Sequence, residues 1–156
     1  MAIASRDIIG DGLPEVYLTS MGDQRLQMLD TEVAGPSCRN ATYRRGTTAH
    51  RPYTGGDGRP STGWHVGFGD VQNDGLDDIL FIKGNAQQMP GSAIKDANNL
   101  LLQASDGSFA VAGAAAGIAS LHRGRSGAMV DLNLDGLLDL AAVNSQTAME
   151  IYQNTT

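Results

Sequence analysis

The sequence holds a single cysteine, Cys38, among its 156 residues. One thiol excludes an internal disulfide, and it excludes a zinc site built from paired cysteines. Aromatic residues make up only 5% of the chain. No stretch approaches the roughly 20 apolar residues that a membrane-spanning helix needs, and no apolar core of a secretory signal follows Met1. The sequence therefore predicts no membrane span.

Basic residues are also scarce, with 11 Lys and Arg against 17 Asp and Glu, for a net charge of −6. Nucleic acids and anionic membrane surfaces bind to basic faces, so neither is expected as a general partner. The chain is 41% hydrophobic and 18% charged, which is typical of a folded globular protein. Its length suits one domain with a real core, and we expect residues 1–156 to form it.

No long apolar stripe of helical period is present, whereas glycines number 20. Three similar segments organise the chain, and their leading acids Asp7, Asp70 and Asp131 are 63 and 61 residues apart. The segments read RDIIGDGLPEVYLTS, GDVQNDGLDDILFIKGN and VDLNLDGLLDLAAVNSQ. A period on this scale predicts a repeat architecture. We place the repeats at about 1–63, with an insertion at 33–63, then at 64–124 and 125–156.

Short apolar runs flank each acidic segment. The runs that follow it directly are EVYLTS, DILFIKG and DLAAVN, and a second set comes after a polar gap: RLQML, NLLLQ and MEIYQN. WHVGFG and SGAMV precede the second and third acidic segments, and SFAVAG follows the turn signal Asp106-Gly107. Runs of this length bounded by Gly, Asn and Asp are typical of strands, which makes each acidic segment a hairpin loop.

A unit of about four strands repeated at this period is typical of a β-propeller blade. The predicted fold class is therefore all-β, with repeated four-stranded antiparallel blades. The chain holds about two and a half such units, whereas closed propellers have about four to eight blades. We therefore expect a partial propeller, either a fragment or one assembled with other chains that cover its exposed sheet edges.

The acidic loops follow the pattern D-x-[DN]-x-D-G-x-x-D, in which positions 1, 3, 5 and 9 supply side-chain oxygens and position 7 a carbonyl oxygen. Calcium takes six to eight oxygen ligands, and glycine at position 6 permits the sharp bend. The predicted ligands are Asp131, Asn133, Asp135, Leu137 and Asp139 in the third loop, and Asp70, Gln72, Asp74, Leu76 and Asp78 in the second. A weaker third site would use Asp7, Asp11 and Glu15, because Ile9 at position 3 has no oxygen to give.

Other interpretations of these loops were weighed. An EF-hand needs an acid at position 12 and flanking helices, but position 12 is Phe81 in the second loop and Ala142 in the third. A plain acidic hairpin turn explains one copy more easily than two nearly complete copies. Magnesium prefers fewer protein oxygens and retained waters, so calcium is the predicted cofactor.

The two complete loops, in GFGDVQNDGLDDILFIKGN and GAMVDLNLDGLLDLAAVN, and the stretch NNLLLQASDGSF resemble the FG-GAP/VCBS repeats of integrin-type β-propellers. The longer stretch NNLLLQASDGSFAVAGAAAGIASLHRGRSGAMVDLNLDG is similar to the bacterial branch related to cartilage acidic protein, whose members often carry an ASPIC/UnbV domain. The resemblance covers nearly the whole chain, most strongly residues 64–154. It implies a calcium-stabilised propeller, usually exported, that serves adhesion or ligand binding. The chain is far shorter than a full propeller of this type and lacks the ASPIC/UnbV segment.

The expected function is a non-catalytic, calcium-stabilised module that binds a protein or a glycan. Loop-only calcium sites of extracellular modules bind at about 10⁻⁴ to 10⁻³ M, so the sites favour a periplasmic or extracellular location. Two alternatives stay open: an accessory or structural subunit of a larger complex, and an enzyme that uses the insertion 33–63. Cys38 with His50, or Ser126 with His122, could pair as nucleophile and base, but neither pair matches a catalytic motif.

The insertion is rich in arginine and tyrosine, which are the residues that interaction surfaces favour. Such an excursion on a rigid scaffold is a candidate for a partner surface, although a solvated loop that covers a sheet edge is the plainer interpretation. The candidate residues are Arg39, Tyr43, Arg44, Arg45, Arg51, Tyr53 and Arg59.

Overall fold

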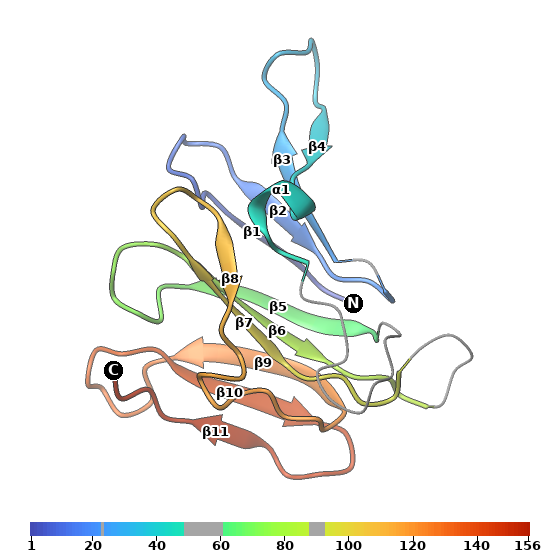
Figure 1. The fold of residues 1–156 in the computed structure, drawn as a ribbon, viewed down its shortest axis with the longest axis vertical. Coiled ribbons are helices and arrows are strands. Elements are labelled where there is room, and N and C mark those ends of the chain that lie inside the picture. Colours follow the sequence, from blue (N-terminus) through green and yellow to red (C-terminus); the bar gives the residue numbers. More distant parts are fainter. Residues whose placement is uncertain (23, 49–60, 88–92) are drawn as a thin grey trace.

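Three antiparallel β-sheets stack one on the next (Figure 1). The structure is a computed structural model that describes residues 1–22, 24–48, 61–87 and 93–156. The strand orders are β1-β2-β3-β4, β5-β6-β7-β8 and β11-β10-β9, and among the described residues no sheet closes into a barrel. The predicted all-β class is confirmed. Within the described part of the chain, no helix is both long and apolar enough to cross a membrane.

Each sheet is built from strands that are consecutive in the sequence. The first sheet contains β1 (Ile3–Arg6), β2 (Glu15–Leu18), β3 (Arg25–Leu29) and β4 (Cys38–Asn40), followed by the short helix α1 (Thr42–Arg45). The second contains β5 (Gly63–Gly69), β6 (Asp78–Lys83), β7 (Asn99–Gln103) and β8 (Phe109–Val111). The third contains β9 (Gly124–Val130), β10 (Asp139–Asn144) and β11 (Glu150–Tyr152). The predicted strands are therefore present, and they flank the acidic loops as hairpins.

Strand β4 comes from inside the segment 33–63 that sequence analysis treated as an insertion. Its three residues are polar and exposed, so they carry no alternation that could have predicted a strand. Pairing with β3 creates it, since Met28 lies opposite Arg39. The first sheet therefore reaches four strands with part of the supposed insertion. Residues 49–60 of that segment lie outside the described part of the chain.

Strand β6 is the centre of the core, because all six of its residues are buried. On one face Ile79 and Phe81 pack against the first sheet, where the Phe81 and Tyr17 ring centroids are 4.8 Å apart. On the other face Leu80 and Ile82 pack against the third sheet. An unbroken apolar run is the sequence that a strand covered on both faces requires.

The first strands of neighbouring sheets also lie close together, since β5 contacts both β1 and β9. Glycine permits the closer of these approaches. A Cβ atom added at Gly127 of β9 would lie 2.7 Å from Ile82 Cγ1 of β6 and 3.3 Å from His65 Cδ2 of β5. The Arg125 guanidinium lies over the Trp64 ring, 4.9 Å from its centroid, which joins β9 to β5 through a cation–π contact.

All three acidic loops lie at the same edge of the stack. They are residues 7–14, 70–77 and 131–138, seen at the left of Figure 1 in blue, green and orange. Each joins the first strand of its sheet to the second, and the sheets stack in the same orientation. The repeat in the sequence thus becomes a row of loops in space.

Candidate metal centre in the acidic loops

The first aspartate of each loop binds the backbone of that loop. Asp131 Oδ1 accepts from the Asp135 amide at 3.1 Å and Asp131 Oδ2 from the Gly136 amide at 2.9 Å. Asp70 accepts the equivalent pair of amides in the second loop, at 3.0 and 2.8 Å. A short side chain that caps nearby amides fixes a turn locally. The loop shape is therefore set by residues that lie within a few positions of one another.

Position 6 of the pattern needs glycine for conformational reasons. Gly75 has φ of +86° and Gly136 has φ of +89°, in the left-handed region where a side chain is strained. Gly12 of the first loop has the same conformation, with φ of +84°. The Asp-Gly dipeptide is thus explained by the bend that brings the following residue back to the loop.

The acid at position 9 is buried and ties three parts of the repeat together. Asp139 is 2% exposed. Its Oδ2 accepts from the Leu132 amide at 3.1 Å, and its Oδ1 accepts from the Asn154 amide at 2.9 Å. The side chain therefore holds the start of the loop and the segment after β11 against the start of β10.

Asp78 occupies the same place in the second repeat and is 0% exposed. It accepts from the amides of Val71 and Gln103, at 3.1 and 2.8 Å. Burial raises the pKa of the Asp78 carboxyl to about 6; the two amides oppose the rise, while the negative charges of Asp74 and Asp70 add to it. The loop thus concentrates negative charge at a buried carboxyl, which a bound cation would stabilise in its ionised form.

The side chains at positions 3 and 5 of the third loop contact each other. Asn133 Nδ2 donates to Asp135 Oδ2 at 2.7 Å, and Asn133 Oδ1 accepts from the Asp135 amide at 3.1 Å. Asp135 Oδ1 also accepts from the Leu137 amide at 2.9 Å. The structure therefore brings the predicted residues at positions 3, 5 and 7 side by side, with Asn133 and Asp135 exposed and Leu137 half-buried.

Position 3 of the second loop, Gln72, is exposed. Its neighbour Asn73, which sequence analysis did not select, donates from Nδ2 to the Gly136 carbonyl oxygen at 3.1 Å and so links the second loop to the third. Asn73 has φ of +54°, a conformation that asparagine adopts more readily than most residues. An asparagine directly before Asp-Gly was the available signal.

In the described ranges, no three His, Cys, Asp or Glu side chains form a group that could hold a metal ion. The acids at position 9 face backbone amides, and those at positions 1 and 5 also bind amides within their loops. The atoms of the second and third loops that are predicted to bind the metal are nevertheless all oxygens, and calcium prefers oxygen ligands. The donor set fits calcium, and the pattern of hydrogen bonds shows that the loops keep their shape through their own amides.

The first loop keeps the same shape with a longer acid. Asp7 accepts from the amides of Gly10 and Gly12, each at 2.8 Å. Glu15 is buried at position 9, where its Oε2 accepts from the Ile8 amide at 3.0 Å, and burial raises its pKa. Ile9, at the position that would need an oxygen, packs against the core between the first and second sheets. This loop therefore uses position 3 for packing.

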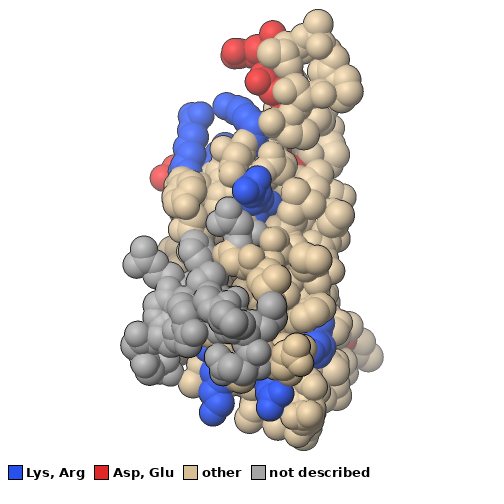
Figure 2. Space-filling model, turned by 90° about the vertical axis from the view of Figure 1, so that its right-hand side faces the viewer, with Lys and Arg blue, Asp and Glu red and all other residues tan. Residues whose placement is uncertain are grey.

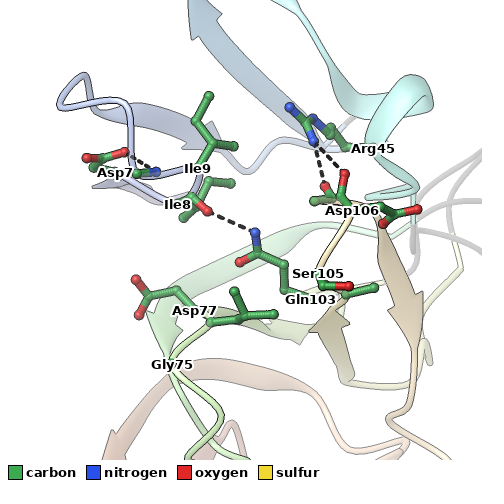
Figure 3. Close-up of a pocket in the computed structure, with 13 residues that line it drawn as sticks. Asp7, Ile8, Ile9, Arg45, Gly75, Asp77, Gln103, Ser105 and Asp106 are labelled. Carbon is green, nitrogen blue, oxygen red and sulfur yellow. Dashed lines mark hydrogen bonds between the residues drawn. The ribbon is translucent and has the colours of Figure 1, made fainter.

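Side-chain amides join the first and second loops to the sheet that follows each of them. Gln103 Nε2 donates to the Ile8 carbonyl oxygen at 2.8 Å (Figure 3). Asn154 Nδ2 donates to the Val71 carbonyl oxygen at 2.7 Å. Ile8 and Val71 are both position 2 of their loops, so two successive interfaces use the same bond. Sequence analysis missed these residues, although both are carboxamides that end a second apolar run.

A pocket of ≈ 420 Å³ lies between the first loop, the second loop and the turn from β7 to β8 (Figure 3). Arg6 Nε donates to Asp77 Oδ2 at 2.7 Å, which joins the end of β1 to the second loop. Arg45, from the predicted partner surface, donates to the Gly107 carbonyl oxygen at 3.0 Å and so holds α1 against that turn. Arg45 therefore has a structural contact within the chain.

The remaining residues of the predicted partner surface divide into two groups. Arg39 on β4 and Tyr43 and Arg44 on α1 are exposed, with Tyr43 78% exposed. The others, Arg51, Tyr53 and Arg59, lie outside the described residues, as does His50. Figure 2 views the side of the molecule at the right of Figure 1, where Lys and Arg are spread over the face and the visible acids gather mainly near its upper end. The acidic loops occupy the other edge.

No protein-family model and no curated protein matches this chain.

Proposed function

We propose that the chain is a non-catalytic, calcium-stabilised β-repeat module of propeller type that binds a protein or a glycan. One observation carries the proposal: two all-oxygen loops of nearly the same sequence lie at one edge of the stack and are held by equivalent hydrogen bonds. The acids at position 5, Asp74 and Asp135, and the amides at position 3, Gln72 and Asn133, are all exposed, so a cation could reach their oxygens.

Each of the two loops would hold one calcium ion, and both would do so in the same way. In the third loop its ligands are the side-chain oxygens of Asp131, Asn133, Asp135 and Asp139 and the carbonyl oxygen of Leu137; in the second they are those of Asp70, Gln72, Asp74 and Asp78 and the carbonyl of Leu76. When bound, calcium supplies positive charge among carboxylates that otherwise repel one another. Its role is structural, and the expected affinity of about 10⁻⁴ to 10⁻³ M suits a periplasmic or extracellular location.

The propeller arrangement is supported by the way the sheets meet. Blades of a propeller are small antiparallel sheets arranged around a central axis. Here β1, β5 and β9 are the first strands of their sheets, and each contacts the next. Such contacts are expected of the innermost strands of successive blades. Further sheets of the same kind would complete a ring.

Thermal unfolding tests the calcium proposal. We expect millimolar Ca²⁺ to raise the midpoint above its value in chelator, and Mg²⁺ to raise it less. Asp135→Asn in the third loop, combined with Asp74→Asn in the second, should remove most of the gain. Glu32→Gln is the matched control, because Glu32 is exposed and lies outside the three loops. A midpoint that is the same in calcium and in chelator would exclude the proposed role.

A further inference from the structure

Apolar side chains are exposed on the two outer faces of the stack. On the third sheet Val143 is 43% and Ile151 is 56% exposed, and Ala141 lies between them as the cross-strand partner of Ile151. On the first sheet Ile3 is 72% exposed and pairs with the half-buried Leu18. Exposed apolar faces of this kind mark interaction sites.

The open face of the third sheet corresponds to a face that is covered inside the molecule. Counting from the acid at position 9, Ala141 and Val143 correspond to Leu80 and Ile82 of β6. Those two residues are buried between the second and third sheets. The outer face of the third sheet is therefore the kind of face on which the next sheet of the stack packs.

The open face of the first sheet corresponds to the complementary face. Val16 and Leu18 occupy the places that Ile79 and Phe81 hold in β6. Ile79 and Phe81 are the residues by which the second sheet covers the preceding sheet. One chain thus carries, at its two ends, the two kinds of face that meet at each of its internal interfaces.

The hydrogen bonds at the loop edge form a series that stops at the outer faces. The carbonyl oxygens of Ile8 and Val71 each accept a side-chain amide from the following sheet. Leu132 is position 2 of the third loop, and its carbonyl oxygen accepts no hydrogen bond from the described residues. By strand register, Leu29 of the first sheet corresponds to the donors Gln103 and Asn154, but its side chain has no donor.

From these correspondences we infer that the outer face of the third sheet binds the outer face of the first sheet of a second copy of this chain. The contact is head to tail and repeats the packing of the two internal interfaces, so it is continuous with them. The inference rests on the proposed repeat architecture. Two copies bring together six sheets, within the four to eight of closed propellers, and a heterologous contact that closes in this way ends as a ring.

Sedimentation of the full chain over a range of concentrations, in calcium, tests the inference. We expect a reversible dimer of the 16.4 kDa chain. Val143→Lys and Ile3→Lys each place a charge on only one of the two faces, so each should shift the dimer to monomer. A mixture of the two variants retains one intact interface, formed by the unmodified faces, and should recover part of the association. Asp106→Asn is a control far from both faces.

A variant that strengthens the dimer gives a more specific test than one that weakens it. Leu29→Gln supplies a donor for the Leu132 carbonyl oxygen and should tighten the dimer by about fivefold, whereas Leu29→Met should leave it unchanged.

A chain that stays monomeric at all concentrations, although calcium raises its melting midpoint, overturns the interface and leaves the proposed function standing. A dimer that neither lysine variant weakens also overturns it. If the lysine variants weaken the dimer but calcium does not raise the melting midpoint, the interface is supported and the calcium role is excluded.

Discussion

Asp139 and Asp135 belong to the same predicted site, but their surroundings give them different roles. Asp139 is buried and accepts two backbone amides, whereas Asp135 is exposed. We expect Asp139→Asn to lower the free energy of unfolding by about 1–3 kcal/mol in chelator, because an NH₂ group would then face one of the two amides. Asp135→Asn should change it by less than about 1 kcal/mol in chelator and show its effect in calcium. Urea unfolding of both variants under both conditions makes the comparison; equal losses in chelator would contradict it.

His65 makes the free energy of unfolding depend on pH, and the direction of its pKa shift gives the sign. Burial lowers the pKa of its ring below the ordinary value of 6.5, because desolvation disfavours the charged form. The unfolded chain therefore binds a proton more readily, and the free energy of unfolding falls as the pH drops through about 6.5 and below. We expect His65→Gln to lose less stability than wild type between pH 7.5 and 5.5. A His65→Gln profile parallel to that of wild type would contradict the assignment.

At the scale of elements, β6 is the strand on which the other sheets depend. Its side chains are shared by the two hydrophobic clusters, one on each face. Phe81→Ala should lower the free energy of unfolding by about 3–5 kcal/mol, because it leaves a cavity beside Tyr17. Val111→Ala on β8, where Val111 is 54% exposed, should cost less than about 1 kcal/mol. Urea unfolding measures both, and similar losses would mean that β6 is not the centre of the core.

The hairpins could be predicted from the sequence because the residues that define a hairpin are neighbours in the chain. An apolar run, an acidic Asp-Gly loop and a second apolar run predict β5–β6 and β9–β10 within a residue or two at each end. Strand β4 was not accessible, since Cys38–Asn40 has no pattern and forms only where β3 offers an edge. The difference is between strands defined by their own residues and a strand defined by its neighbour.

At the scale of the whole molecule, the sheets are joined by equivalent side-chain amides. Gln103→Leu should remove the bond to Ile8 and weaken the contact between the first and second sheets, at a cost of about 1–2 kcal/mol. Hydrogen exchange should then rise in residues 3–18 and stay unchanged in residues 139–152. Asn154→Leu removes the bond to Val71 and should affect the third sheet instead. Exchange that rises uniformly over all three sheets in either variant would show that the bridges do not act locally.

The sequence by itself determined the period, the strands beside the loops and the oxygen chemistry of positions 1, 3, 5 and 9, because each depends on residues that are close together in the chain. Only the tertiary structure decided that all three loops share one edge and that β6 is covered on both faces. It also decided that Asp78 and Asp139, the acids at position 9 of the second and third loops, bind the distant amides of Gln103 and Asn154. These features depend on which sheets face one another, and packing between segments about 60 residues apart leaves no local pattern to read.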